Sequence, residues 1–459
     1  MMQLRRSLGL TDVVLFFVIT CTNLQWVATA AAAGPSSLPI WFIGCAAMFI
    51  PLSIAVMHLS SLYPEEGGMY VWSRRAFGPF GGFMTGWSYW SSNLPYFPAL
   101  LYFTAGNAMF IGGETPHGLA GSPLYFMAFS LIAFAVGTLL NIFGLDVGKW
   151  LNNVGAASRW MVTLILIALG VAAWRHFGPA TLINASTMQP GFHLKDLVFW
   201  SVIAFAWTGP EAVPFMAGEI KDARRTIPHG LAIAAPGIAA IYVLGTVSVL
   251  VALPAAHVSA LYGVMQSISA VAARLNLVVL TPIAAILVTL SCLGSVGAWL
   301  GAVARIPFVA GIDKYLPESF GRMHPRWASP VTALLTQAGI ALIFIVIGQG
   351  GTTVKGAYDV LVSSTVLSTM IPFLLLFASA LKLPGGKPLV WVSALVGLCT
   401  TITSIGLAMV PAQDEQNKPL AVAKVLGLTA FIIGSGVIAY YFGRKRAAAE
   451  FARNSKEID

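Results

Sequence analysis

The sequence is poor in charged residues. Asp, Glu, Lys and Arg make up 9% of its 459 residues, whereas hydrophobic residues make up 57%. Soluble globular domains have about a quarter charged residues, so this composition excludes that class. The net charge of +9 could suggest nucleic-acid binding, but in a chain with long apolar runs the basic residues report on loop topology instead. The sequence therefore predicts a multi-pass protein of the lipid bilayer, without a nucleic-acid partner.

Cysteine is scarce as well. The four cysteines lie in apolar stretches and show no CxxC spacing, which favours neither a disulfide framework nor a thiolate metal site. The seven histidines have no ligand spacing, and the chain has no Walker-type phosphate loop. No Ser-His-Asp or Cys-His arrangement supports catalysis. We therefore expect no metal, no cofactor, no ATP-driven step and no enzymatic reaction, and no obligatory protein partner is evident.

Long apolar runs dominate the sequence. A bilayer core of about 30 Å needs roughly 20 apolar residues per helix. An amphipathic segment at 258–275 is expected to lie at one membrane surface. Runs of membrane-spanning length predict twelve transmembrane helices, near residues 12–33, 39–60, 82–110, 122–143, 150–174, 197–217, 228–253, 278–310, 329–348, 357–381, 387–410 and 421–443.

The basic residues predict the orientation of these spans. An even number of spans places both termini on one side of the membrane. Alternate loops give that side most of the lysines and arginines, among them Arg74, Arg75, Arg224 and Arg225. Because cytoplasmic loops are enriched in basic residues, both termini are expected in the cytoplasm, with the chain in the plasma (inner) membrane.

Two of the predicted spans contain residues that a membrane helix disfavours. The stretch TNLQ at 22–25 interrupts the first, and Gly209 and Pro210 precede Glu211 in the sixth. Proline removes a backbone donor, and glycine permits non-helical geometry. Freed backbone groups are tolerated in lipid only where they line a cavity or are buried in protein. The spacing of the breaks predicts two five-helix inverted repeats whose broken first helices hold a solute. A proline kink used only for packing is the alternative for the sixth span.

Three motifs resemble the amino acid–polyamine–organocation transporter superfamily, and the resemblance covers nearly the whole chain. Each is a weak pattern by itself, but all three occur in the order found in that superfamily. They are YPEEGGMYVWSRRAFGPFGGFMTGWSYW at 63–90, FAWTGPEAVPFMAGEIKDARRTIP at 205–228 and ARIPFVAGIDKYLPESFGRMHPRWASP at 304–330.

The resemblance implies the LeuT-type fold, an all-α integral membrane protein of twelve transmembrane helices with discontinuous helices one and six. The first inverted repeat would comprise residues 1–175 and the second residues 192–382. Residues 383–459 would add spans eleven and twelve and a cytoplasmic tail. Most members carry a Gly-Ser-Gly-type motif at the first break, whereas this chain has TNLQ at 22–25, which is closer to the glutamate/GABA-antiporter-like members.

The two breaks and the spans around them supply a candidate solute site. Polar groups in hydrocarbon need partners, which a solute or a neighbouring helix could provide. Phe205 lies where relatives carry an aromatic lid, with Trp207 nearby, and core packing is the alternative for both. The candidate substrate-binding residues are Thr22, Asn23, Gln25, Asn93, Tyr96, Phe205, Ala206, Trp207, Gly209, Ser363 and Ser364.

Two charged residues within the spans are candidates for coupling. A carboxylate at the midplane costs on the order of 3 kcal/mol, so Glu211 should face a wet cavity or carry a proton. The resemblance implies proton-dependent transport through it, and a purely structural glutamate is the alternative. Arg159 matches, by the same resemblance, a lysine whose ammonium replaces sodium in related transporters. An arginine that extends to the membrane surface is the alternative.

These features together predict a sodium-independent secondary transporter of amino acids that works by alternating access, through exchange or proton coupling. The helix ends at the breaks would offer partial charges of both signs to a zwitterion. A small amino-bearing solute and protons are thus the expected partners. Cationic amines or polyamines held by Glu211 are the alternative substrates, and a solute sensor without transport is the alternative function.

Overall fold

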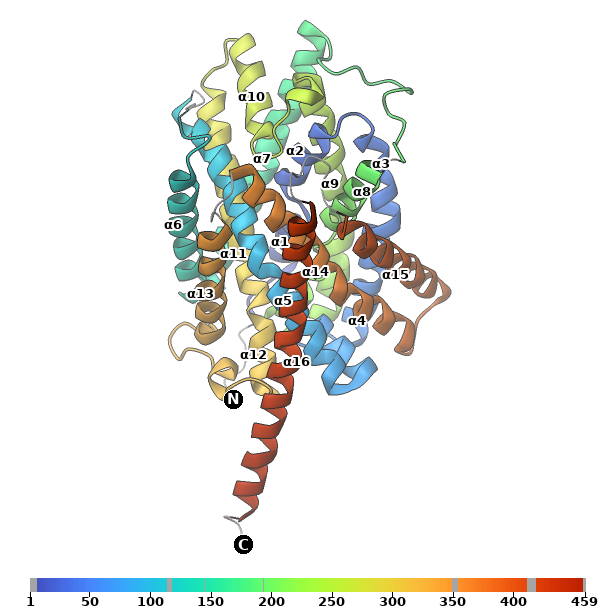
Figure 1. Cartoon of the computed structure of the whole chain (residues 1–459), viewed down its shortest axis with the longest axis vertical. Helices are drawn as coiled ribbons and strands as arrows, with labels where there is room; N and C mark the ends of the chain where they lie inside the picture. The colour runs from blue at the N-terminus through green and yellow to red at the C-terminus, as the bar shows by residue number, and fades with distance from the viewer. Residues whose placement is uncertain are drawn as a thin grey trace.

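The computed structural model describes residues 6–113, 118–143, 145–192, 194–348, 354–410 and 418–456. Over these ranges the chain is helical, and its one β-type contact is an isolated bridge between Leu8 and Ile220. The helices are α1 (Leu10–Cys21), α2 (Leu24–Ala32), α3 (Ser37–Gly44), α4 (Ile50–Leu62), α5 (Met69–Ala108), α6 (Pro123–Ile142), α7 (Leu145–Phe177), α8 (Leu194–Ala206), α9 (Ala223–Ala252), α10 (Gly263–Arg274), α11 (Leu280–Val303), α12 (Arg305–Ile312), α13 (Val331–Gly348), α14 (Val354–Lys382), α15 (Pro388–Ala408) and α16 (Lys418–Lys456) (Figure 1).

Short helical turns connect some of these helices. A π-helical turn, η1 (Cys45–Phe49), joins α3 to α4, so that the predicted second span is one continuous run of helix. Four 3-10 turns lie elsewhere: η2 (Met109–Gly112), η3 (Val213–Glu219), η4 (Ala255–His257) and η5 (Glu318–Gly321).

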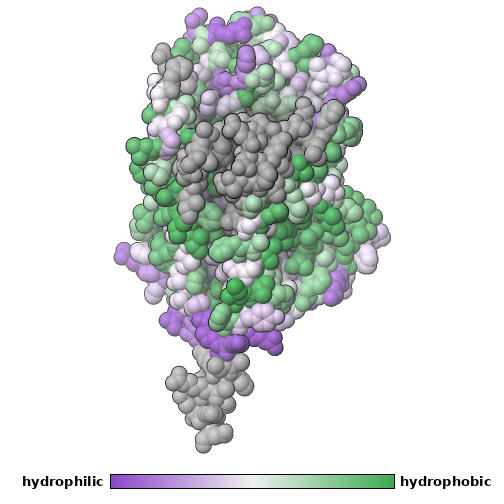
Figure 2. Space-filling model, viewed as in Figure 1, coloured by the Kyte–Doolittle hydropathy of each residue, from purple (hydrophilic) through white to green (hydrophobic). Residues whose placement is uncertain are grey.

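Within the described residues, eight helical segments are long and apolar enough to cross a membrane. Figure 2 shows hydrophobic side chains across the middle of the visible face and hydrophilic side chains gathered at its two ends. Exposed apolar residues such as Leu124, Ile132 and Leu164 are suited to contact with lipid tails, whereas a surface in water rarely carries so many exposed apolar side chains. The eight segments are Leu10–Ala32, Ser37–Leu62, Pro123–Ile142, Gly148–Phe177, Ala223–Ala252, Leu280–Gly311, Leu361–Lys382 and Pro388–Ala408.

The other four predicted spans are helical too, but they are not among these eight segments. The third lies in α5, the sixth in α8 and η3, the ninth in α13 and the twelfth in α16. In α13 the apolar part, Val331–Val346, is shorter than the eight segments. The count of twelve spans therefore stays a prediction. The predicted amphipathic segment forms α10, which lies at the end of the molecule opposite the two termini (Figure 1).

Helix α5 runs through the middle of the bundle and packs against α14, α11, α6 and α16 (Figure 1). Its 40 residues bend at Gly78, whose φ of 80° lies in the left-handed region that glycine adopts without a Cβ clash. The segment beyond this bend contains the predicted third span. Its buried face carries Tyr89, Asn93 and Tyr96, so α5 brings polar groups to the centre of the bundle.

The chain near the N-terminus is tied to the end of η3. The backbone N–H groups of Ser7 and Leu8 donate to the carbonyl oxygen of Glu219 at 3.0 and 3.1 Å, and the N–H of Lys221 donates to the carbonyl oxygen of Leu8 at 2.9 Å. Helix α12, the N-terminus and the C-terminus lie at the same end of the molecule (Figure 1). We call this end the terminal end.

Candidate functional site

The first helical pair is interrupted where the sequence predicts an interruption. Helix α1 stops at Cys21 and α2 starts at Leu24, with Thr22 and Asn23 in extended conformation. The side chain of Asn23 caps α2, because its Oδ1 accepts a hydrogen bond from the N–H of Gln25 at 3.1 Å. An asparagine at this position thus both ends one helix and starts the next.

The second interruption lies between α8 and η3. Helix α8 ends at Ala206, and Gly209 has a φ of 125°. A Cβ on Gly209 would lie 2.7 Å from the carbonyl oxygen of Thr20 and 2.8 Å from the Cα of Cys21. The two interrupted segments therefore touch, and only glycine fits both the backbone angle and the contact.

Replacing Gly209 by alanine is expected to lower the thermal unfolding temperature of the detergent-purified protein and to abolish transport. The added methyl group meets backbone atoms, which cannot move aside as a flexible side chain could. Strained left-handed backbone alone costs on the order of 1–3 kcal/mol. Gly406→Ala in α15 is the control, since nothing lies within 4 Å of its added Cβ. Equal unfolding temperatures for the two variants would contradict the close contact.

Tyr242 of α9 joins the two interruptions. Its hydroxyl oxygen lies 3.0 Å from the carbonyl oxygen of Cys21 and 2.8 Å from that of Ala206, and it accepts a hydrogen bond from the N–H of Asn23 at 3.2 Å. The ring stacks on Trp41 at a centroid distance of 4.4 Å. One buried side chain thus binds the C-terminal ends of both α1 and α8. No sequence signal distinguishes this tyrosine from others in apolar helices.

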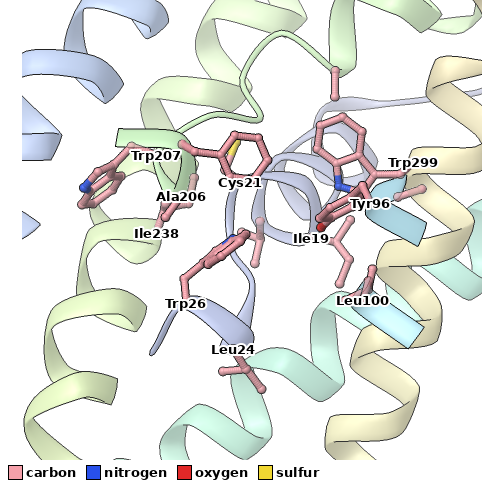
Figure 3. Close-up of a cluster of buried hydrophobic side chains, with 14 of the residues drawn as sticks. Ile19, Cys21, Leu24, Trp26, Tyr96, Leu100, Ala206, Trp207, Ile238 and Trp299 are labelled. Atoms are coloured by element: carbon pink, nitrogen blue, oxygen red, sulfur yellow. The ribbon is translucent and has the colours of Figure 1, made fainter. Parts of the chain in front are cut away.

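A cavity lies where the interruptions meet α5, α9, α11 and α14, and we call it the central cavity. Its walls are aromatic rings, hydroxyls and amides, and among the described residues no charged side chain lines it. Figure 3 shows Trp26, Tyr96 and Trp299 around the break between Cys21 and Leu24. The lining residues are Thr20, Asn23, Trp26, Tyr89, Asn93, Tyr96, Phe205, Ala206, Thr208, Tyr242, Trp299, Thr365 and Thr369.

The structure brings five of the predicted substrate-binding residues to this cavity: Asn23, Asn93, Tyr96, Phe205 and Ala206. The amide of Asn23 donates to the hydroxyl of Tyr96 at 3.1 Å, while the amide of Asn93 donates to a carbonyl of its own helix. Phe205 meets the ring of Trp26 edge-on, with centroids 5.5 Å apart. These contacts order the cavity wall.

The other predicted residues do not line the central cavity. The hydroxyl of Thr22 donates back to the carbonyl of Val18 at 2.5 Å. Trp207 points away from Tyr96 and Trp299 (Figure 3), and its indole N–H donates to the carbonyl of Trp41 at 3.1 Å. The remaining residues that lie outside the lining are Gln25, Gly209, Ser363 and Ser364.

On α14 the residues that line the central cavity are Thr365 and Thr369, not the predicted Ser363 and Ser364. Ser363 is exposed and Ser364 is buried away from the cavity, whereas the two threonines lie one helical turn apart on the same face. A run of hydroxyl residues in one helix does not reveal which face points inward. That choice depends on how α14 packs against α5.

The sequence analysis also missed several other lining residues. Tyr89 precedes Asn93 by four residues, so helical spacing from a predicted residue could have found it. Trp26 directly follows the first interruption, which is also a usable signal. Thr20, Thr208 and Trp299 carry none.

Glu211 is completely buried in the second interruption. Its Oε1 accepts a hydrogen bond from the hydroxyl of Tyr89 at 2.6 Å, and its Oε2 accepts one from the N–H of Gly209 at 2.8 Å. The carboxyl group thus lies behind Tyr89, one side chain away from the central cavity, and does not line it.

Arg159 of α7 is completely buried, so it does not extend to the membrane surface. Its guanidinium donates to the carbonyl oxygen and, at 3.0 Å, to the hydroxyl of Thr22. It also donates to the hydroxyls of Ser291 and Ser295 on α11, at 2.5 and 2.8 Å. The cation therefore sits between the C-terminal end of α1 and α11, where the partial negative charge of a helix end favours it.

A buried ionic cluster lies toward the terminal end. The guanidinium of Arg305 is 2.6 Å from the carboxylate of Glu219 and 3.8 Å from that of Glu66. Glu66 in turn accepts a hydrogen bond from the N–H of Gly218 at 2.7 Å. Burial, with the neighbouring Glu219 carboxylate, raises the pKa of Glu66 well above its usual value. The cluster connects the loop between α4 and α5 to η3 and α12.

Comparison with known proteins places the chain in a family. The amino acid permease family matches residues 7–433. An uncharacterized transporter of Legionella pneumophila is 26% identical over 453 residues, which cover 95% of this chain and 96% of that protein. A probable agmatine/putrescine antiporter of Lactococcus lactis is 26% identical over 343 residues, which cover 75% and 72%. An uncharacterized transporter of Mycobacterium tuberculosis is 25% identical over 464 residues, which cover 100% and 95%.

The chain therefore belongs to the amino acid permease family, within the amino acid–polyamine–organocation superfamily that its motifs resemble. Its relatives are transporters, and its long apolar helices make it a multi-pass membrane protein. Within the described ranges, no group of three or more His, Cys, Asp and Glu side chains is placed to hold a metal ion.

Proposed function

We propose that this protein is a sodium-independent secondary transporter of small solutes that carry an ammonium group, with the central cavity as its solute site. The supporting observation is a polar, aromatic cavity that lies where two interrupted helices touch. Interrupted helices in a membrane are tolerated where their freed backbone groups are buried or line such a cavity. Solute would enter and leave by alternating access.

The architecture we propose is the LeuT-type fold, with twelve spans and two inverted repeats at residues 1–175 and 192–382. Spans eleven and twelve and a tail would follow at 383–459. The protein would lie in the plasma (inner) membrane with the terminal end in the cytoplasm, because alternate loops of the predicted spans assign most of the basic residues to the side of the termini.

The contacts at the helix ends bear on the choice of solute. Two N–H groups at the start of α2 already have partners: that of Asn23 binds the hydroxyl of Tyr242, and that of Gln25 binds the side chain of Asn23. The carbonyls at the end of α1 and α8 bind Tyr242 and Arg159. These contacts use helix-end groups that a zwitterion would otherwise need, which supports a solute without a carboxylate.

The side chains that line the central cavity suit a cationic solute. Trp26, Tyr96, Phe205 and Trp299 offer ring faces and edges to an ammonium group, and the hydroxyls and amides offer acceptors. Among the described lining residues there is no cationic side chain to pair with a carboxylate. The geometry thus favours cationic amines over α-amino acids, in keeping with the name of the Lactococcus lactis relative. Amino acids remain the second candidate because of the family.

A ligand screen tests this function. Purified protein is heated with putrescine, agmatine, glutamate, GABA, arginine or leucine, because a ligand of the folded state raises the unfolding temperature by mass action. Proteoliposomes preloaded with each compound then report exchange of the labelled compound. We expect stabilisation and exchange by the amines. Stabilisation without flux would instead identify a sensor, and no stabilisation by any compound would contradict the proposal.

The cavity wall offers a matched pair of variants for the same screen. Thr369→Val removes a lining hydroxyl at constant shape and is expected to weaken amine binding about five- to tenfold, since a net hydrogen bond is worth about 1 kcal/mol. Thr401→Val in α15 removes a buried hydroxyl that binds only its own helix, at Gly397, and should leave binding unchanged. Equal effects of the two would place the solute elsewhere.

We propose that Glu211 carries the coupled proton. Its carboxyl group binds Tyr89, which lines the central cavity, so solute and proton would influence each other through one side chain. Glu211→Gln is expected to make the transport rate independent of pH between about 5 and 8, while exchange of labelled for unlabelled solute persists. An unchanged pH profile in this variant would count against the role. The matched control is Glu318→Gln, which removes an exposed carboxylate of η5.

A further inference from the structure

A second cavity lies between the central cavity and the terminal end. It lies among α1, α6, α7, α11, α12 and η3. On α1 its wall is Phe16, one helical turn before Thr20 of the central cavity, and on α11 it is Gly301, two residues beyond Trp299. We call it the terminal-side cavity. Helices α1 and α11 thus line both cavities, as expected if the two lie along one solute path.

Unlike the central cavity, the terminal-side cavity is lined by charged side chains. The ammonium of Lys149 lies 2.7 Å from the Oδ2 of Asp12, and the amide of Asn153 donates to the Oδ1 of Asp12 at 3.1 Å. Arg305 borders the cavity as well. These side chains come from α1, α7 and α12, which lie far apart in the sequence.

Two buried polar atoms at this cavity have no hydrogen-bond partner among the residues that the structure describes. They are the Oδ1 of Asn152, whose side chain is 8% exposed, and the Nε of Arg305, which is 5% exposed. The Nε of Arg305 faces the carboxylate of Glu66 at 3.8 Å, whereas the Oδ1 of Asn152 has no such neighbour in the described part of the chain. Buried polar atoms are normally satisfied, so this unpartnered acceptor indicates a place for a polar ligand. The acceptor suits the N–H of an ammonium group, and Asp12 supplies a carboxylate near it.

We propose that the terminal-side cavity is a second subsite for the ammonium-bearing solute, occupied on its way to or from the terminal end; this inference rests on the proposed function. In the present conformation Lys149 neutralises Asp12. A solute ammonium in the cavity would compete with Lys149 for the carboxylate of Asp12. It would also donate a hydrogen bond to the Oδ1 of Asn152. Removing either the carboxylate of Asp12 or the amide of Asn152 should therefore weaken the binding of solute that arrives from the terminal end, but not of solute from the opposite face.

The first test counts bound solute. Equilibrium dialysis of the full-length purified protein with labelled putrescine, and in a parallel arm labelled glutamate, is expected to give two bound molecules per chain. Asn152→Leu, which keeps the size of the side chain, and Asp12→Asn should each reduce this number to one. Thr138→Val on α6 and Asp222→Asn, the exposed residue before α9, are the controls and should retain two. One bound molecule in the unmodified protein would overturn the subsite alone, whereas none in either arm would overturn the proposed function and the subsite with it.

The second test uses the two faces of the membrane. In proteoliposomes of known orientation, Asn152→Leu and Asp12→Asn are expected to raise the half-saturating putrescine concentration at the terminal-end face about tenfold. The value at the opposite face should stay within about twofold. An equal rise at both faces would show a general effect on the fold or the central cavity, and no rise at either face would exclude solute from the terminal-side cavity.

Discussion

Replacing Arg305 by methionine is expected to destabilise the protein by about 3–5 kcal/mol, because it leaves buried carboxylates without their counter-charge. Glu219 is 2% exposed and lies 2.6 Å from the guanidinium, and Glu66 accepts no other charged partner within the described residues. Glu219 and Glu66 both depend on this one cation, and Glu66 in turn binds the backbone N–H of Gly218 in η3. Thermal unfolding in detergent at neutral pH measures the loss.

Matched variants separate the buried charge from the general loss of an arginine. Arg322→Met breaks the pair of Arg322 with Glu318, whose side chains are 75% and 57% exposed, and should cost at most about 1 kcal/mol. Arg305→Met combined with Glu219→Gln should recover part of the loss, since one uncompensated charge is then gone. If Arg305→Met and Arg322→Met unfold at the same temperature, the cluster does not act as a buried ionic network.

Replacing Arg159 by methionine is expected to lower transport to about 1% or less of the unmodified rate. The guanidinium satisfies the carbonyl and hydroxyl of Thr22 and the hydroxyls of Ser291 and Ser295 at the same time. Each buried polar group left without a partner costs about 1–3 kcal/mol, and these groups hold the end of α1 against α11. Arg159→Lys should recover part of the activity, because an ammonium keeps the charge but not the planar fork of donors.

We propose that Arg159 substitutes for a bound cation. Because the guanidinium occupies the oxygen-lined space beside Thr22, a sodium gradient at fixed voltage and pH should not stimulate transport by the unmodified protein. Arg159→Ala would vacate the space, so sodium chloride, compared with choline chloride, should raise the unfolding temperature of that variant only. Sodium stimulation of the unmodified protein would contradict the proposal. Equal responses of both proteins to sodium would reduce Arg159 to a structural role.

Local sequence features predicted the positions of the helices and of the two interruptions. A run of apolar residues needs only its own length and composition to form a membrane helix, and Gly209 with Pro210 breaks one through its own backbone chemistry. For the same reason Asn23 could be identified as a residue at a helix break, since an asparagine that caps the following turn acts within a few residues of itself. Hydropathy also predicted α10 as an amphipathic surface segment.

The lining of the central cavity could not be predicted in this way. Ser363 and Ser364 carry the same kind of group as Thr365 and Thr369, and only the rotation of α14 against α5 decides which pair points inward. Trp207 was placed with Phe205 because the two are neighbours, yet helical geometry ends between them and Trp207 turns toward Trp41. Side-chain direction changes abruptly at a helix break, so spacing ceases to be a guide there.

The amino-acid sequence by itself determined that this is an all-helical membrane protein of the amino acid permease family with breaks at residues 22–25 and 209–211. Tertiary structure alone decided that Arg159 is buried between α1 and α11, that Glu211 lies behind Tyr89, and that Tyr242 joins both breaks. The reason is physical. A helix forms from interactions between residues a few positions apart, whereas the fate of a buried polar group depends on partners from other helices, here 36 to 221 residues away in the sequence.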